Sequence, residues 1–317
     1  MRYEQKKCPS CNSPIVKKNG RRNGVQLYKC MACGKQFRGK TRPTSEKVWN
    51  LYLNNKQTVA EISEVLRTSP STVKRLLKEV VQKWQQPSIS GSGVVHLDAT
   101  YFGRNTGVLL ALEAGSGRVL YMAHIAHEHI SDYEDAVRHI SEQGYNIKGI
   151  VIDGLQKLFV ALGEYPIQMC QFHMVAIIRR KLTKNPQLEA GKELLNLVYG
   201  LKTSNRDTFS KQFQEWKSRW KQFLNEKTVN PTTNKEFYTH QRLRSAMTSI
   251  SFYLKWLFTF ENVPGMPNTN NMIEGTFTDL KKNLRNHPGM SEVNRKRFMN
   301  GFFLAYEKLH NEKGGTQ

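Results

Sequence analysis

Long apolar runs, acidic residues and scattered cysteines are all scarce in this chain of 317 residues. No stretch is long and apolar enough to cross a membrane, which excludes a transmembrane protein. The start of the chain, MRYEQKKCPS, lacks the apolar core of a signal peptide. Of the five cysteines, four form two close pairs, a pattern that fits a metal site in a reducing compartment better than a disulfide framework. We therefore expect a cytoplasmic protein.

The shortage of acids leaves a large positive charge. Against 48 Lys and Arg there are 26 Asp and Glu, giving a formal net charge of +22 and a pI of about 9.8. Such an excess favours a polyanionic partner, and nucleic acid is the usual one. Residues 1–90 hold 19 basic and 5 acidic side chains, a net of +14. General solubility does not require this clustering, so we expect a basic DNA-binding region at the N-terminus.

Two C-x2-C pairs define the first segment of the chain. Their members are Cys8, Cys11, Cys30 and Cys33. Two such turns, joined by a hairpin-like stretch, can present four thiolates tetrahedrally to Zn²⁺, and four thiolates leave no open position, so the zinc would be structural. Two local disulfides are the alternative. We predict a zinc ribbon over residues 1–42, with Arg21 and Arg22 among cations that contact phosphates; a solvated basic face is the weaker interpretation.

Residues 43–88 have the pattern of a helix-turn-helix domain. Thr58 and Glu61 have the spacing of a capping box, and Ser69-Pro70 begins a further helix. Its polar side carries Ser71, Thr72, Lys74, Arg75 and Lys78. This layout is typical of a helix-turn-helix whose second helix reads DNA, although an ordinary helical hairpin has the same pattern. The neighbouring basic ribbon favours DNA binding.

The stretch VVHLDATYFG at 94–103 predicts a buried strand, which follows a flexible boundary rich in Gly and Ser. His96, Asp98 and Thr100 share one face of that strand. A buried aspartate is costly without a partner, and a metal ion is one candidate. GIVIDG predicts another strand that ends in Asp153. Three antiparallel strands followed by alternating helices and strands predict a mixed α/β sheet over 92–186, in which the two aspartates can approach each other.

Residues 187–264 have a wholly helical pattern, which predicts an all-α insertion. Its aromatic side chains recur at helical spacing, and we interpret them as a packed core rather than as a surface that stacks on DNA. The last segment, 265–310, carries a helix with Glu274 in its first turns. Asn271 and Glu274 also have capping-box spacing, so a helix-capping role for Glu274 stays open. Further along this helix, three cations can follow a DNA backbone: Lys281, Lys282 and Arg285.

Several of these motifs together resemble a known family. Asp98 in LDATYFG, Asp153 in IVIDG and Glu274 in TNNMIEG, with Cys170 and His173 in MCQFHM, are similar to motifs of the Asp-Asp-Glu transposases of bacterial insertion sequences. Within these, the chain resembles the Mutator-like group, in which an all-α insertion separates the second Asp from the Glu. The resemblance covers residues 8–305 and also includes the zinc ribbon and the helix-turn-helix.

The resemblance implies a multidomain α+β protein with a ribonuclease H-like catalytic domain. The three acids would be its catalytic triad and bind Mg²⁺ or Mn²⁺, which prefer oxygen ligands. We interpret Cys170 and His173 as support for that site. The implied reaction is hydrolysis of a phosphodiester at a transposon end, followed by attack of the freed 3′-hydroxyl on target DNA. The N-terminal domains would bind the terminal inverted repeats, and a dimer or larger assembly would hold both ends in a bacterial cytoplasm.

Two other functions remain open on the sequence. One is a zinc-ribbon and helix-turn-helix transcriptional regulator whose ribonuclease H-like half is inactive and dimerises. The other is a structure-specific nuclease that does not join strands. Metal-dependent nicking distinguishes the regulator from both enzymes, and a joined product distinguishes the transposase from the nuclease.

Overall fold

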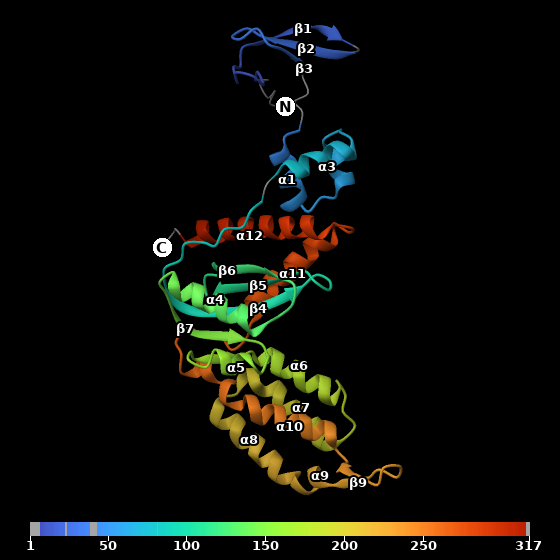
Figure 1. Ribbon diagram of the computed structural model, residues 1–317, viewed down its shortest axis with the longest axis vertical. Coiled ribbons are helices and arrows are strands. Elements are labelled where there is room, and N and C mark those ends of the chain that lie inside the picture. Colours follow the sequence, from blue (N-terminus) through green and yellow to red (C-terminus); the bar gives the residue numbers. More distant parts are fainter. Residues whose placement is uncertain (1–6, 23, 39–42, 81, 315–317) are drawn as a thin grey trace. The chain divides into compact units, whose positions relative to one another are not determined.

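The computed structural model describes residues 7–22, 24–38, 43–80 and 82–314 (Figure 1). The chain divides into two compact units, residues 1–81 and 82–317. Residue 23, in the hairpin-like stretch between the two cysteine pairs, lies outside the described residues. In the described part of the chain there are twelve α-helices, and none of them is long and apolar enough to cross a membrane.

The first unit begins with a small antiparallel sheet in the order β1-β2-β3. Its strands are β1 (Val16–Arg22), β2 (Val25–Cys30) and β3 (Gln36–Arg38). Within the described part of residues 7–38, Cys8 and Cys30 are the buried side chains. A segment with so small an apolar core needs another source of stability, and a bound metal ion is the usual one at this size.

Three short helices complete the first unit: α1 (Ser45–Leu53), α2 (Val59–Val65) and α3 (Pro70–Glu79). The side chains of Thr44, Thr58 and Ser69 each accept a hydrogen bond from a backbone N–H in the first turn. The predicted capping box is confirmed, because Glu61 also accepts from the Thr58 N–H at 2.7 Å. Fully buried apolar residues join the three helices: Val48, Ile62 and Val73.

A mixed five-stranded sheet in the order β6-β5-β4-β7-β8 forms the centre of the second unit. Its strands are β4 (Gly91–Tyr101), β5 (Gly107–Glu113), β6 (Val119–Ile125), β7 (Tyr145–Ile152) and β8 (Ile167–Met169). The first three are antiparallel, and β4, β7 and β8 are parallel. This confirms the predicted mixed sheet. Helices on both faces explain why β5 is buried along nearly its whole length.

The helices around this sheet follow the alternation seen in the sequence (Figure 1). They are α4 (Ile130–Glu142), α5 (Leu158–Ala161), α6 (Gln171–Leu182), α11 (Asn271–Arg285) and α12 (Glu292–Gly314). Helix α4 packs on β5, β6 and β7, whereas α11 packs on β4 and β5 and α12 on β6. Helix α11, whose first turn carries Glu274, thus packs directly on the central strand β4.

The segment between α6 and α11 is mainly helical but not all-α, so that prediction was wrong. It contains α7 (Glu189–Tyr199), α8 (Arg206–Arg219), α9 (Lys221–Asn225) and α10 (Gln241–Tyr253). Between α9 and α10, β9 (Lys227–Val229) and β10 (Glu236–Tyr238) pair as an antiparallel hairpin. Each strand is only three residues long, and the turn that joins them contains Asn234 at φ 51°. Strands this short contain too few β-branched and aromatic residues to give a clear period-2 pattern in the sequence.

The aromatic residues of this insertion form a packed core, as predicted. Phe209, Phe213 and Trp216 are buried, and Trp220 and Phe223 pack against the same apolar cluster. The indole N–H of Trp216 donates to the Ala190 carbonyl oxygen at 3.0 Å, which ties α8 to α7. These side chains are therefore not a surface for stacking on DNA bases.

Candidate functional site

The four N-terminal cysteines converge on one point, with their sulfur atoms within 4.8 Å of one another. The sulfurs of Cys8 and Cys33 are 3.6 Å apart, and those of Cys11 and Cys30 are 3.5 Å apart. Sulfurs at the corners of a tetrahedron around zinc lie about 3.8 Å apart when each Zn–S bond is about 2.3 Å. The cluster therefore fits a structural zinc ion, as the sequence predicted.

Backbone turns shape this cluster. In each pair, the N–H four residues after the first cysteine bonds back to that cysteine's carbonyl: Asn12 to Cys8 at 2.9 Å and Gly34 to Cys30 at 3.0 Å. Both donor residues have positive φ, which Gly and Asn adopt most readily. The backbone N–H of Cys33 donates to the Cys30 sulfur and lowers the pKa of that thiol to about 6. The turn thus favours the thiolate form that binds metal.

A second candidate site lies where β4 and β7 run side by side. These strands are parallel, and His96 pairs with Val151. Asp98 and Asp153 each come two residues later, so both continue in the same direction on adjacent strands about 4.8 Å apart. The backbone register therefore brings together two acids that are 55 positions apart in the sequence.

The half-buried carboxyl group of Asp98 has a pKa raised to about 8. Burial is the largest cause, and repulsion from Asp153 is the next; Glu274 and Glu128 add smaller repulsions, whereas the Ala99 N–H, which donates to Asp98 at 2.8 Å, lowers the value. Asp153 accepts a hydrogen bond from the Leu155 N–H at 3.0 Å, which fixes its side chain. Three other acids thus help to raise the pKa of Asp98.

Glu274 reaches this region because the residues before α11 are held in place. The Nδ1 atom of buried His96 donates to the Asn270 side-chain oxygen at 2.6 Å, and the Asn270 N–H donates to the Cys170 sulfur at 3.2 Å. The Gln171 N–H donates to the Asn268 carbonyl at 3.0 Å. These bonds join the start of α11 to β4 and to the start of α6.

The capping interpretation of Glu274 was wrong. Helix α11 has Asn270 rather than Asn271 at its N-cap, and no side chain caps it. The Asn270 side chain bonds to His96 instead, and Glu274 Oε1 is buried without a hydrogen-bond partner. A first-turn glutamate still complements the helix dipole, but the Glu274 carboxylate lies beside His173.

Cys170 and His173 lie beside Glu274 at the start of α6. One ligand atom from each of the three residues lies within 4.8 Å of the other two, and His173 Nδ1 is 3.5 Å from Glu274 Oε1. In the described residues, two groups of at least three His, Cys, Asp or Glu side chains have ligand atoms within 4.8 Å of one another: this cluster and the four N-terminal cysteines. Neither group contains Asp98 or Asp153. The triad is therefore not gathered around a single point within that distance.

Sequence reasoning missed three residues of this region. His96 and Asn270 were not assigned a role, and only their hydrogen bond, across 174 positions, reveals one. Glu128 lies just before α4, accepts a hydrogen bond from Tyr133, and helps to raise the pKa of Asp98. No motif or spacing marks Glu128, because its place depends on how the loop after β6 returns to the sheet.

The predicted DNA-contacting side chains lie on exposed surfaces. Arg21 and Arg22 are exposed on β1, and on α3 every predicted residue is exposed except half-buried Thr72: Ser71, Lys74, Arg75 and Lys78. Arg75 forms an ion pair with Glu79. On α11, Lys281, Lys282 and Arg285 are exposed.

Three hollows of the second unit are lined by cations. One, of about 310 Å³, contains Lys281 and Arg285. Another, of about 660 Å³, contains Glu128 and Gly154 together with Lys157, Arg180 and Lys181. Gly154, the residue after Asp153, lines this second hollow, whereas Asp98, Asp153 and Glu274 are not among its lining residues.

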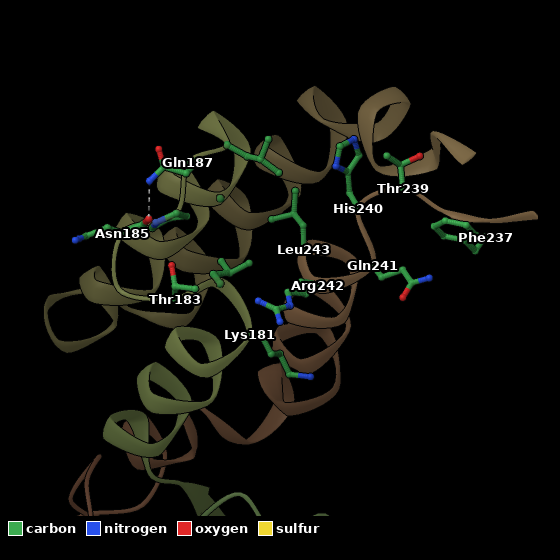
Figure 2. A pocket seen from close by; sticks show the side chains of 14 residues that line it. Lys181, Thr183, Asn185, Gln187, Phe237, Thr239, His240, Gln241, Arg242 and Leu243 are labelled. Carbon is green, nitrogen blue, oxygen red and sulfur yellow. Dashed lines mark hydrogen bonds between the residues drawn. The ribbon is translucent and has the colours of Figure 1, made fainter. Parts of the chain in front are cut away.

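The third hollow, of about 460 Å³, lies between the end of α6 and the start of α10 (Figure 2). Lys181 lines it as well, and Arg242 projects from the first turn of α10. No acidic residue lines it. Lys181 therefore links two cationic hollows, one of which Gly154 also lines.

No family model matches the sequence, and no curated protein matches it. Among solved structures, the chain is similar to the Drosophila P element transposase strand transfer complex, with a TM-score of 0.33 and 11% identity over 87% of this chain and 82% of that chain. It is also similar to a chain of the simian T-cell lymphotropic virus intasome bound to the PP2A regulatory subunit B56 gamma, with a TM-score of 0.21, 12% identity and 64% of each chain covered. The function proposed below rests on this chain's own residues.

Proposed function

We propose that this chain is a DNA transposase of the Asp-Asp-Glu type with a ribonuclease H-like catalytic domain. The observation that carries the proposal is the convergence of Asp98, within β4, and Asp153, directly after the parallel neighbour β7, with Glu274 close enough to influence Asp98. A group of acids on rigid elements, next to a hollow lined by cations, is suited to a metal-dependent reaction of a phosphodiester.

The acids fit hard divalent cations such as Mg²⁺ or Mn²⁺. Burial first and repulsion from Asp153 next raise the pKa of Asp98, and Glu274 Oε1 is buried without a hydrogen-bond partner. Oxygen ligands are the type these cations prefer. Because the triad does not gather within 4.8 Å, it would suit two ions about 3.5–4 Å apart better than a single ion. When bound, such ions activate an attacking oxygen and stabilise a leaving oxygen at phosphorus.

The chain's own side chains have separate tasks in this proposal. Asp98, Asp153 and Glu274 hold the ions, and Cys170 and His173 support Glu274 at the start of α6. Lys157 and Arg180 bind phosphates that flank the reacting one, because they line the hollow beside Asp153. The hydrogen bond between His96 and Asn270 fixes α11 relative to β4.

Other residues bind the rest of the DNA. Arg21 and Arg22 of the ribbon contact phosphates, and the exposed side of α3 reads bases of the terminal inverted repeats of a bacterial insertion sequence. Its members are Ser71, Thr72, Lys74, Arg75 and Lys78. Lys281, Lys282 and Arg285 hold the backbone near the catalytic site. The two ends of an element have to be joined together, so the active form is a homodimer or larger on DNA. We assign the chain to the Mutator-like group and to the bacterial cytoplasm.

A strand-transfer assay tests this function. Purified protein is mixed with labelled element ends and a supercoiled target plasmid, with Mg²⁺ or with a buffer that lacks divalent cations. We compare the natural chain with Glu274→Gln and with Asp279→Asn, an exposed acid on the same helix. We expect joined product only with Mg²⁺, at least about 1000-fold less with Glu274→Gln, and an unchanged level with Asp279→Asn.

Other results would change the assignment. Metal-dependent nicking without joining identifies a nuclease. Specific DNA binding without any cleavage identifies a regulator. Full activity of Glu274→Gln removes Glu274 from the triad.

A further inference from the structure

Cys170 and His173 form, together with Glu274, a set of donors that differs from the proposed Mg²⁺ ligands. The Cys170 sulfur is fully buried at the end of β8, His173 lies in the first turn of α6, and Glu274 lies in the first turn of α11. One thiol, one imidazole and one carboxylate from three elements therefore meet within 4.8 Å.

Two of the three donor atoms are buried without a hydrogen-bond partner. They are His173 Nδ1 and Glu274 Oε1, which lie 3.5 Å apart in a geometry that makes no hydrogen bond. An unpartnered buried polar atom costs about 1–3 kcal/mol, so two adjacent ones indicate a missing ligand. The side chains of His173 and Glu274 are each 29% exposed, which leaves an ion a route from solvent.

The spacing fits a tetrahedral ion. Zn²⁺ binds nitrogen at about 2.0–2.1 Å and carboxylate oxygen at about 2.0–2.2 Å, so tetrahedral N and O ligands lie about 3.4 Å apart. The observed separation of 3.5 Å between His173 Nδ1 and Glu274 Oε1 agrees with this value. Three protein ligands leave a fourth position for water.

The donor types select the ion. Thiolate and imidazole favour Zn²⁺ and similar thiophilic cations, whereas Mg²⁺ and Mn²⁺ prefer oxygen. We propose that Cys170, His173 and Glu274 form a second zinc site, distinct from the four-cysteine ribbon. On binding, the Cys170 S–H bond breaks, an S–Zn bond forms and the proton passes to solvent.

This site would have a regulatory consequence, and that part rests on the function proposed above. Glu274 belongs to both ligand sets, and its Oε1 cannot take its place in the Mg²⁺ site while it binds zinc with Cys170 and His173. Zinc at the second site therefore inhibits DNA cleavage by occupying Glu274. The ribbon zinc has no such effect, because all four of its ligands lie in residues 8–33.

Zinc content measured on the full chain tests the site without any reference to activity. After dialysis against buffered Zn²⁺, we expect two zinc ions per natural chain, and one in Cys170→Ser and in His173→Asn. His139→Asn is the matched control, since His139 belongs to no ligand group in the described residues, and it should keep two. Cys170 is buried, so replacing it can cause misfolding. His173 is partly exposed, and the His173→Asn variant therefore tests the site with less risk of misfolding. One zinc ion in the natural chain, or two in both variants, would overturn the proposal.

Cobalt distinguishes the two sites by their sulfur content. In Cys33→Ser, which removes a ribbon ligand, we expect one Co²⁺ per chain with a weak thiolate charge-transfer band, because one sulfur contributes instead of four. His173→Asn should keep the strong band of the ribbon. No bound Co²⁺ in Cys33→Ser would contradict a second site with a single sulfur.

A zinc titration of Mg²⁺-dependent nicking tests the regulation. We expect zinc to inhibit the natural chain, and Cys170→Ser to require at least about 100-fold more free Zn²⁺ for the same fractional inhibition, since even loss of an outer-shell partner weakens binding 10–100-fold. A second bound zinc without inhibition would refute the competition. No nicking with any metal would refute the proposed function and leave the zinc stoichiometry intact.

Discussion

The two candidate metal sites of this protein are built in opposite ways. The ribbon takes its four ligands from residues 8–33, on two turns of nearly identical shape. The proposed catalytic site takes Asp98, Asp153 and Glu274 from two strands and a helix that span 177 positions. Short-range geometry is thus enough for the first, whereas the second exists only after the sheet has formed.

The two regions also differ in what stabilises their fold. The ribbon has almost no apolar core, so its ligands have to hold it together. The second unit, which holds the proposed catalytic site, has a large core around the sheet, and its acids work against stability, as the raised pKa of Asp98 indicates. We expect metal removal to unfold the ribbon and to leave the second unit folded.

The largest expected effect is therefore in the ribbon. Cys30→Ser removes a thiolate from a structural zinc site, whose binding free energy in small zinc domains is about 10–16 kcal/mol. We expect residues 7–38 to become sensitive to protease in the full chain, with binding to the element's end lost and the cleavage pattern of residues 82–314 unchanged. Limited proteolysis with mass spectrometry measures both. Ser10→Ala, which changes the same region but removes no sulfur, should behave as the natural chain. A ribbon that stays resistant to protease in Cys30→Ser would show that its fold does not depend on the metal ligands.

The next effect concerns the pH dependence of the second unit. The pKa of Asp98 is about 8 in the folded chain against an ordinary value of 3.8, so the folded state binds more protons between these pH values. Stability therefore falls as pH rises from about 4 to about 8, by at most about 1.4 kcal/mol per pH unit.

Urea unfolding in buffer without divalent cations measures this decline between pH 5 and pH 7.5. We expect Asp98→Asn to lose distinctly less stability over this range than the natural chain, and excess Mg²⁺ to reduce the decline in the natural chain. Asp279→Asn, which replaces an exposed acid on α11, should decline as the natural chain does. An equal decline in all three proteins would mean that the raised pKa of Asp98 is not the cause.

A smaller effect is expected on the DNA-reading helix. Lys74 is exposed on α3, whereas Arg75 forms an ion pair with Glu79. Lys74→Ala should weaken end binding by about 1 kcal/mol and lower the slope of log K against log salt by about 1, as loss of one phosphate contact predicts. Fluorescence anisotropy over a salt series measures it, with Lys47→Ala on α1 as the matched control. An unchanged slope would remove Lys74 from the interface.

The smallest effect tests a purely local feature. Thr58→Ala removes the capping box of α2, which should cost about 1 kcal/mol of stability in the first unit and leave catalysis by the second unit unchanged. Thermal unfolding followed by circular dichroism measures the cost. Thr68→Ala, just before α3, is the control and should have little effect, since its hydroxyl caps no helix.

The sequence was most informative where structure depends on near neighbours. The C-x2-C turns, the Thr58 capping box and the helix that begins at Ser69-Pro70 were all predicted, because spacing and side-chain chemistry act within a few residues. Alternating strands and helices also predicted the mixed sheet. The β9–β10 hairpin was missed because three-residue strands leave too little periodicity within a helical segment.

What the sequence determined by itself is the presence and local setting of each chemical group: four thiols on two turns, one acid within a strand, one acid at the end of another strand, and one in the first turn of a helix. Only the tertiary structure decided which of them meet. The register of β4 against β7 aligns Asp98 with Asp153, and the bond from His96 to Asn270 brings Glu274 beside Cys170 and His173. The reason is physical: these contacts depend on strand pairing and helix packing across more than 50 residues, and local spacing does not encode such distances.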